Sequence, residues 1–472
     1  MKALITIGLM LCLAIAAPAA DPLNVIVVLV DDLGWMDVGV QGSDFYNTPN
    51  IDKLAQTGMR FTDGYAACAV CSPTRAALMT GRYPARLGIT DWIRAEFQLQ
   101  ARQWPNIRQA PGYHRSDNTL ITPVNELILP HSEITLAEML KPLGYSSRFI
   151  GKWHLGGRGY LPTDQGFDEN YGGWDYGQPP SYFDPYVVGE WLPMGIPTLT
   201  PRKKDEYLTD READEAVSFI RKNREQPFFL YLAHYAVHTP IQAKPDLIKK
   251  YEKARDQKGQ DDPVYASMVH SVDDAMGRLL STLEELGLDD NTLIVFTGDN
   301  GGLDREGRPT ENAPLRSGKG YAYEGGLRTP WIFRWPGVTQ PGSVSNTPIS
   351  SVDLAPTIAS AVGTRPPVDR VIDGIDLTPA LQGYSIEDRA LYWHFPHYRH
   401  GPGHDPYSVI RDGDLKLIKF YDPPKLELYD LAKDLSETSD LAPTQPDKVS
   451  ELEAKLDAHL ESVGAGIPRA QP

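Results

Sequence analysis

Four stretches of consecutive apolar residues lie in the first two thirds of the chain, and each ends in charged or polar side chains. The first runs from Asn24 to Val30 and is followed directly by Asp31 and Asp32. A run of this length, rich in β-branched residues, is typical of a strand buried on both faces, as in a parallel sheet. The other three runs cover residues 148–151, 228–233 and 293–296. The pattern predicts four strands of one buried sheet.

Apolar residues at helical spacing lie between these runs. The longest such segment extends from about Pro263 to Leu286 and predicts an amphipathic helix. Two shorter helices are predicted by capping-box pairs, Thr135 with Glu138 and Thr209 with Glu212. Because strands alternate with helices over residues 24–362, we expect an α/β fold with a mostly parallel central sheet flanked by helices.

The pattern changes at about residue 385. The runs Tyr407 to Arg411 and Leu415 to Tyr421 flank Asp412-Gly413, which favours a hairpin turn, and Leu426 to Tyr429 is expected to add a third strand. Four apolar residues at helical spacing then predict a final helix: Val449, Leu452, Leu456 and Leu460. We therefore expect a small C-terminal antiparallel sheet covered by one helix.

The N-terminus has the pattern of an export signal. Met1-Lys2 is followed by an apolar stretch to Ala17 and by small residues before Asp21, with an Ala-x-Ala cleavage site. The stretch is shorter than the ~20 residues that a bilayer span needs, so we expect no membrane span in the mature protein. We expect a periplasmic or secreted protein, and the lack of an Asn-x-Ser/Thr site favours a bacterial periplasm. The expected division is a signal peptide over 1–20, a catalytic domain over 21–384 and a C-terminal subdomain over 385–472.

The formal net charge of -16 excludes some classes of partner. Nucleic acid and anionic membranes are disfavoured, because binding to them needs clustered Lys and Arg. A sulfated polymer would be repelled as well. An anionic substrate must therefore be attracted by a local cluster of Lys, Arg, His and metal within an acidic shell.

The polar residues that follow the predicted strands form a candidate site. In open α/β sheets, ligands bind at the carboxyl ends of the strands. Asp31 and Asp32 follow the first strand, and Asp299 and Asn300 follow the last. Their oxygens are the ligands that a hard cation prefers. The other two strands bring Lys152, His154 and His238 to the same edge.

A reactive residue is predicted at Cys71. Pro73 suits the first position of a helix, and Gly81 suits its left-handed stop. A helix N-terminus attracts anions and lowers the pKa of a thiol, so Cys71 is expected to be a reactive centre facing an anion. Cys68 and Cys71 also allow a disulfide or a redox pair. Structural zinc would need two more ligands near this loop.

Cys71-x-Pro73-x-Arg75, followed by Ala-Ala-Leu and by Thr-Gly-Arg-Tyr-Pro at 80–84, resembles the signature of the type I, formylglycine-dependent sulfatases. The segments 48–52 and 87–92 resemble bacterial arylsulfatase A-type enzymes that act on carbohydrates. The resemblance implies an alkaline phosphatase-like fold and a sulfuric ester hydrolase that releases inorganic sulfate from a sulfated sugar. Sulfated galactose or N-acetylgalactosamine is the leading expectation.

The resemblance also implies a matured residue and a metal. Cys71 would be converted to Cα-formylglycine (3-oxoalanine) by a formylglycine-generating or an anaerobic sulfatase-maturing enzyme. An oxygen of that residue would join four side chains in holding Ca²⁺: Asp31, Asp32, Asp299 and Asn300. Because formylglycine hydrate has two hydroxyls, it would attack sulfate with one and expel it with the other.

The resemblance assigns roles to the remaining residues. Arg75 would hold the loop of residue 71, and Lys152 and Lys319 would bind sulfate oxygens as point charges. Asp299 would activate the attacking hydroxyl. His238 would contact the substrate and protonate the leaving alcohol, and His154 would take the proton of the second hydroxyl. We expect both histidines to titrate near neutrality.

The walls of the substrate pocket are less defined by sequence. The segments 90–130 and 155–205 lack periodicity and are rich in Trp, Tyr, Arg and Gly, so we expect them to wall the pocket. Candidate sugar contacts are Asp91, Trp92, Arg94, Trp174, His394, His397, Tyr398, His400 and His404. Three alternatives stay open: a phosphatase or phosphonate monoester hydrolase, a non-catalytic glycan-binding protein, and a thiol-redox protein.

Overall fold

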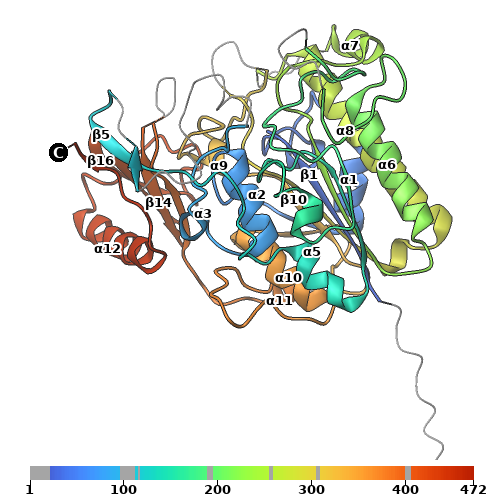
Figure 1. Ribbon diagram of the computed structural model, residues 1–472. Helices are drawn as coiled ribbons and strands as arrows, with labels where there is room; N and C mark the ends of the chain where they lie inside the picture. The colour runs from blue at the N-terminus through green and yellow to red at the C-terminus, as the bar shows by residue number, and fades with distance from the viewer. Residues whose placement is uncertain are drawn as a thin grey trace, which may run out of the picture.

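An eight-stranded sheet forms the centre of the protein (Figure 1). The computed structural model describes residues 22–95, 112–114, 117–188, 195–254, 259–304, 309–398 and 405–471. The strands lie in the order β11 (Ser343–Ser345), β2 (Met59–Phe61), β10 (Trp331–Arg334), β9 (Thr292–Gly298), β1 (Asn24–Val30), β8 (Phe228–His234), β6 (Ser146–Gly151) and β7 (Glu169–Tyr171). Only β10 runs antiparallel to its neighbours among these strands. The predicted α/β fold with a mostly parallel sheet is confirmed.

The four predicted buried strands are β1, β6, β8 and β9, and they form the middle of the sheet. Successive side chains of a strand point to opposite faces. On β1, Ile26, Val28 and Val30 enter the hydrophobic core on one face, whereas Val25, Val27 and Leu29 enter the core on the other. Burial on both faces explains why this strand is apolar at every position rather than at alternate positions.

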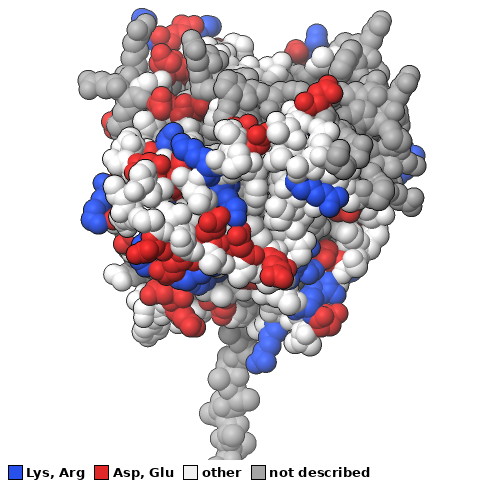
Figure 2. Space-filling model, turned by 90° about the vertical axis from the view of Figure 1, so that its left-hand side faces the viewer, with Lys and Arg blue, Asp and Glu red and all other residues white. Residues whose placement is uncertain are grey.

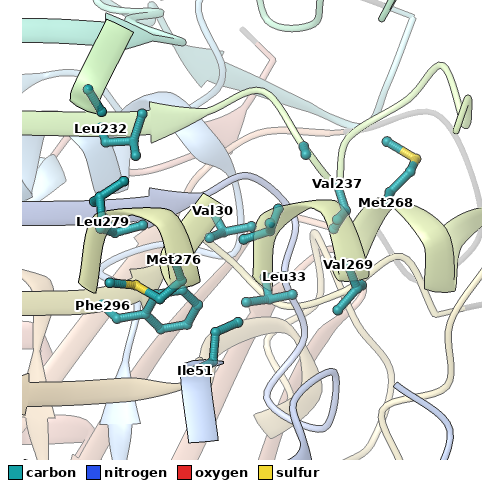
Figure 3. Packing of buried hydrophobic residues seen from close by; sticks show 14 of the residues in the cluster. Val30, Leu33, Ile51, Leu232, Val237, Met268, Val269, Met276, Leu279 and Phe296 are labelled. Carbon is teal, nitrogen blue, oxygen red and sulfur yellow. The ribbon is translucent and has the colours of Figure 1, made fainter. Parts of the chain in front are cut away.

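The longest helix covers one face of the sheet together with three others. It is α8 (Pro263–Leu286), which has the predicted bounds and ends at Gly287 in a left-handed conformation. Figure 3 shows Met276 of α8 packed over Phe296 of β9, close to Val30 of β1. Full burial of a side chain of this size contributes roughly 1.5–3 kcal/mol. The other helices of this core are α1 (Pro49–Thr57), α6 (Leu208–Lys222) and α7 (Pro245–Tyr251).

The opposite face is covered by shorter helices, and one of them carries Cys71. Their residues pack against the second side of β1. The helices are α2 (Cys71–Thr80), α5 (Leu136–Leu140), α10 (Leu354–Ala361) and α11 (Thr378–Leu381). Gly81 ends α2 with a φ of 73°, as predicted. The helix begins at Cys71, so the prediction that Pro73 is its first residue was wrong. Proline fits there because the first-turn N–H groups have no helical acceptor.

One capping box is present and the other is not. The Thr135 hydroxyl accepts the Glu138 N–H at 3.2 Å, and the Glu138 carboxylate accepts the Thr135 N–H at 2.8 Å. Helix α6, in contrast, begins at Leu208, and the Glu212 carboxylate lies 2.6 Å from His234 Nδ1. The prediction of a cap by Thr209 and Glu212 was wrong, because this carboxylate instead pairs with a buried histidine.

The C-terminal sheet has four antiparallel strands: β13 (Leu391–Phe395), β14 (Tyr407–Asp412), β15 (Leu415–Tyr421) and β16 (Pro424–Asp430). The predicted three strands are present, and β13 was missed. Helix α12 (Pro446–Ser462) covers one face through Val449, Leu452, Leu456 and Leu460. The other face packs on residues of the main domain, among them Tyr65 and Leu327. The small sheet with one helix is therefore confirmed, and it lies beside the central sheet (Figure 1).

The remaining elements are short. They include α3 (Pro84–Leu87), α9 (Glu324–Leu327), the pair β3 (Gly64–Tyr65) with β12 (Ile349–Ser350), and the small sheet of β4 (Tyr113–His114), β5 (Leu120–Pro123) and β17 (Arg469–Ala470). Five 3₁₀ turns complete the described chain: 39–41, 141–143, 162–165, 289–291 and 351–353. Among the described helices, none has the length and apolar character needed to span a bilayer.

The buried His394 makes the stability of the protein depend on pH. Burial lowers its pKa to about 4, and the Gly466 carbonyl only partly opposes this. The unfolded chain binds the proton with a pKa near 6.5. Above about pH 6.5 this histidine therefore costs little free energy of unfolding. The free energy of unfolding decreases as the pH falls from 6.5 toward 4, because only the unfolded chain binds the proton in this range. Between pH 7 and pH 5 we expect this histidine to cost about 2 kcal/mol.

Denaturant unfolding at pH 7 and pH 5 tests this expectation. Between the two pH values, the free energy of unfolding of His394→Gln should fall by about 2 kcal/mol less than that of the wild type. His131→Gln, at an exposed position, is the matched control and should follow the wild type. Equal losses in the wild type and in His394→Gln would contradict the assignment.

Candidate active site

Two neighbouring strands bring four oxygen-bearing side chains together. The register pairs Val30 of β1 with Gly298 of β9, so Asp31 and Asp299 follow adjacent strand ends. Asp299 Oδ1 accepts the Asp32 N–H at 3.1 Å. Asn300 Nδ2 donates to Asp32 Oδ1 at 2.8 Å. All four side chains are fully buried, so the edge of the sheet predicted from sequence is a compact acidic cluster.

Three buried or nearly buried cations face this cluster. Lys152 Nζ lies 2.7 Å from Asp31 Oδ2, and Lys319 Nζ lies 2.5 Å from Asp32 Oδ1. Arg75 Nε donates to Asp299 Oδ2 at 2.8 Å, and its Nη1 donates to the Lys152 carbonyl. On the face in Figure 2, acidic and basic side chains lie beside one another, with acidic ones gathered across its lower half. Inside the site, the three cations pair one to one with the carboxylates of Asp299, Asp31 and Asp32.

Cys71 is the first residue of α2 and is buried at the same place. Its Sγ lies 3.3 Å from His154 Nδ1. Burial raises the pKa of the Cys71 thiol, although Lys152 and Lys319 act in the opposite direction. The prediction of a lowered thiol pKa was therefore wrong, because desolvation outweighs the two nearby ammonium groups. Cys68 and Cys71 are both buried and form no disulfide in the structure.

His154 is oriented by backbone groups. Its ring Nε2 lies 2.6 Å from the Ile93 carbonyl. Its backbone N–H donates to the Trp174 carbonyl at 2.9 Å. Because a carbonyl only accepts, Nε2 carries the proton and Nδ1 presents its lone pair to Cys71. A side chain at Gly177 would come within 2.9 Å of the imidazole, so glycine is needed for this loop to close on it. Burial and Lys152 hold the pKa of His154 well below its usual value.

His238 follows β8 and reaches the cluster from the other side. Its Nδ1 donates to the Thr239 carbonyl at 2.9 Å, and its Nε2 lies 3.6 Å from Asp32 Oδ2. Burial and Lys319 lower the pKa of His238 to about 3, against the opposite effect of Asp32. The expectation that His154 and His238 titrate near neutrality is therefore wrong for the protein without substrate.

The residues present fit a hard cation. Three buried oxygens have no hydrogen-bond partner among the described residues: Asp31 Oδ1, Asp32 Oδ2 and Asn300 Oδ1. Ligand atoms of Asp31, Asp32 and His238 lie within 4.8 Å of one another. Burial and Asp299 raise the pKa of Asp31 well above its usual value, despite Lys152. A divalent cation would supply the missing partners and the missing positive charge.

The predicted pocket wall reaches the site in part. The segment of Asp91, Trp92 and Arg94 contains Ile93, whose carbonyl contacts His154, and the Arg94 guanidinium lies 4.9 Å from the Trp92 ring centre. Trp174 also contacts His154 through its carbonyl. These parts of segments 90–130 and 155–205 therefore lie beside His154.

Three of the C-terminal candidates lie among the described residues, and each contacts another group of the protein. His394 is buried, with Nδ1 2.7 Å from the Ser408 hydroxyl and Nε2 3.0 Å from the Gly466 carbonyl, so its prediction as a sugar contact was wrong. His397 Nε2 lies 2.7 Å from the Thr90 hydroxyl. Tyr398 donates to Asp422. His400 and His404 lie outside the described residues.

Sequence reasoning missed the groups that orient His154. The Ser72 hydroxyl donates to the His154 carbonyl at 2.9 Å and accepts the Ile93 N–H at 3.0 Å. Ser72 follows Cys71 directly within the signature, and this position could have indicated a role beside Cys71. The Ile93 carbonyl is a backbone group, so its residue type carries no signal.

Comparisons with known proteins agree with this arrangement. The family model "Sulfatase" matches residues 23–364, and "N-sulphoglucosamine sulphohydrolase, C-terminal" matches residues 317–465. N-acetylgalactosamine-6-sulfatase of Rattus norvegicus is 37% identical over 402 residues, covering 80% of this chain and 70% of the relative. A sulfatase of Formosa agariphila is 31% identical, covering 93% and 88%. The solved structure of Ps i-CgsB in complex with k-i-k-neocarrahexaose is 30% identical, covers 93% of each chain and has a TM-score of 0.77.

The fold and the site define a hydrolase of anionic esters with an alkaline phosphatase-like architecture. The chain belongs to the sulfatase family. It is a sulfuric ester hydrolase, and the predicted family and enzyme class are confirmed.

Proposed function

We propose that this protein is an exported, calcium-dependent sulfatase that removes sulfate from a carbohydrate ester through formylglycine at position 71. The position of residue 71 carries the proposal: it begins α2 in a buried site, 3.3 Å from His154 and beside a lysine–carboxylate cluster. The named substrates of the relatives support a sugar, and N-acetylgalactosamine or galactose sulfate is the leading candidate.

The surroundings of residue 71 support its maturation to formylglycine. Cys71 Sγ stands where an oxygen of the matured residue would lie. A buried thiol with a raised pKa is a weak nucleophile at pH 7, whereas formylglycine hydrate supplies a hydroxyl nucleophile and a second hydroxyl for release. His154 Nδ1 is placed to accept a proton from residue 71, and its Nε2 proton is held by the Ile93 carbonyl.

Lys152 and Lys319 would hold the sulfate. Each ammonium has three donors, and the contact with Asp31 or Asp32 leaves others for sulfate oxygens. These two ammonium groups would supply the local positive charge that an anionic substrate needs in a protein with a net charge of -16. Arg75 keeps Asp299 and the Lys152 backbone in place, which fixes the cluster before the substrate arrives.

His238 would protonate the leaving alcohol. Thr239 holds the proton on Nδ1, so Nε2 is the atom that gains and gives the catalytic proton. The pKa of about 3 applies without substrate. A sulfate beside Lys319 would raise this pKa, because a nearby anion favours imidazolium. Binding of the anionic substrate would thereby favour the protonated form of His238 that the leaving alcohol needs.

Four side chains would hold the calcium ion: Asp31, Asp32, Asp299 and Asn300. Both oxygens of Asp299 already accept a hydrogen bond, so it would bind through a remaining lone pair. The three unpartnered oxygens of the other residues support the assignment, and His238 is a further neighbour. When bound, the ion would polarise the sulfate and offset the carboxylate charge.

Export and maturation complete the proposal. The pattern over residues 1–20 favours removal of a signal peptide, and a formylglycine-generating or anaerobic sulfatase-maturing enzyme would act on Cys71. The catalytic domain would extend over 21–384 and the C-terminal subdomain over 385–472.

Release of inorganic sulfate from sulfated mono- and oligosaccharides tests the function, with matched phosphate esters as the comparison. The protein should carry an aldehyde at residue 71, verified by peptide mass. We expect kcat/KM for sulfate to exceed that for phosphate by at least about 100-fold, because the site recognises the transition state of one ester. A preference for phosphate would contradict the proposal.

A further inference from the structure

A hollow of about 420 Å³ lies between the main domain and the end of the C-terminal sheet. The segment around Lys319 lines it with Arg316, Tyr321 and Tyr323, and the C-terminal sheet lines it with Phe420, Lys425 and Glu427. The register pairs Phe420 of β15 with Lys425 of β16, so these walls lie at one end of that sheet. We call this feature the interdomain hollow.

One short segment of the chain, residues 317–321, contributes both to the interdomain hollow and to the proposed active site. Ser317 and Tyr321 line the hollow, and Lys319 lies between them with its Nζ 2.5 Å from Asp32 Oδ1. Two residues of chain span at most about 7 Å. The Gly320 N–H donates to the Ala69 carbonyl at 2.8 Å, which ties the same segment to the residues before Cys71. The segment 317–321 therefore belongs both to the wall of the hollow and, through Lys319, to the proposed sulfate site.

A network of polar contacts fixes one wall. The Arg316 guanidinium lies 3.7 Å from the centre of the Tyr323 ring, and its Nη1 donates to the Tyr429 hydroxyl at 3.1 Å. Tyr323 and Tyr429 both donate to Glu427 Oε2, at 3.0 and 2.8 Å. Because these side chains are already held by one another, a ligand would meet a formed surface and pay little ordering entropy.

The chemistry of the walls matches a sugar without sulfate. Tyr321, Tyr323 and Phe420 offer aromatic surface for the apolar face of a sugar ring, and the charged groups offer partners for hydroxyls. Two cations, Arg316 and Lys425, are balanced by two acids, Asp405 and Glu427, so the formal charge is zero. A second sulfate would find no excess of positive charge here. The volume is within the usual range for small-ligand sites.

We propose that the interdomain hollow is a subsite for an unsulfated sugar unit of the same oligosaccharide whose sulfated unit reacts at residue 71. This inference rests on the proposed function and extends it: the substrate is an oligosaccharide, and the C-terminal subdomain takes part in selecting it. The subsite adds affinity for the chain and makes a sulfated monosaccharide the poorer substrate.

Two substrates test the subsite by kinetics. One is N-acetylgalactosamine 6-sulfate, and the other is a tetrasaccharide with that sugar at the non-reducing end and three unsulfated units. We expect the wild type to show a kcat/KM at least about tenfold higher on the tetrasaccharide. Phe420→Ala and Lys425→Ala should each lower this ratio about fivefold or more. Lys433→Ala, at an exposed position of the same subdomain, is the matched control and should keep it.

The outcomes separate the subsite from the reaction. Equal kcat/KM values on both substrates in the wild type would overturn the subsite, as would variants that slow both substrates equally. Calorimetric titration with the unsulfated tetrasaccharide gives a second readout that needs no turnover. If the Kd for the unsulfated tetrasaccharide rises about fivefold in Lys425→Ala, the subsite is supported. This holds even if no sulfate is released from either sulfated substrate. Absence of sulfate release would count against the proposed function alone. No binding to the wild type at millimolar concentration would overturn the subsite.

Discussion

Cys71→Ala is expected to lower sulfate release by at least about 10³-fold, because it removes the group that we propose matures into the nucleophile. The fold should survive. The Cys71 side chain is small and lies at the first turn of α2, where its Sγ is 3.3 Å from His154 Nδ1. Turnover of the sulfated sugar and thermal unfolding, measured on the same preparation, provide the two readouts. We expect the midpoint of unfolding to change by only a few degrees.

Cys68→Ala is the matched control for this prediction. Cys68 is buried three residues before Cys71 and is also a free thiol. It should retain most of the wild-type turnover, because the chemistry needs only position 71. Wild-type rates in Cys71→Ala would refute the nucleophile, and loss of turnover in Cys68→Ala with a normal fold would revive a role for the thiol pair.

Treatment with a chelator is expected to remove the proposed calcium ion, to lower sulfate release by at least about 100-fold and to lower the unfolding midpoint by roughly 3–5 °C. Without a cation, Asp31 Oδ1, Asp32 Oδ2 and Asn300 Oδ1 have no hydrogen-bond partner among the residues that the structure describes. Lys152 and Lys319 would then serve the carboxylates rather than the sulfate. Calcium should restore both the rate and the midpoint, and the comparison with magnesium measures the preference between the ions.

Two asparagines near opposite ends of β9 provide a variant and its control. Asn300→Ala should abolish the rise of the unfolding midpoint on calcium addition. Asn291→Ala should keep it, because Asn291 precedes β9, where its amide donates to the Pro22 carbonyl. If chelation changes neither the rate nor the midpoint, and metal analysis finds no calcium, the metal assignment falls.

The candidate site was largely predictable because its residues follow local signals. Asp31 follows a strand that is apolar at every position, and Asp299 follows another. Adjacent parallel strands end at the same edge, so local patterns placed these acids together. Cys71 and Arg75 came from one continuous signature. Their predicted roles in metal binding and catalysis await the experiments above.

Electrostatic properties of the site were less predictable. The low pKa of His238 and the raised pKa of Cys71 both arise first from burial. Burial depends on what the rest of the chain stacks over a residue, which no window of sequence reports. The helix N-terminus at Cys71 was predicted correctly as a location, but its effect on the thiol was overestimated.

By itself, the sequence determined the central strands, the long helix α8, the C-terminal sheet with α12, and the residues gathered at the strand ends. Each of these depends on a periodic pattern or a motif within a few residues. Tertiary structure alone decided that Glu212 pairs with His234, that the Ile93 carbonyl orients His154, and that β13 joins β14. These contacts join separate elements, and one of them spans 61 residues, so they form only when the packed fold brings their partners together.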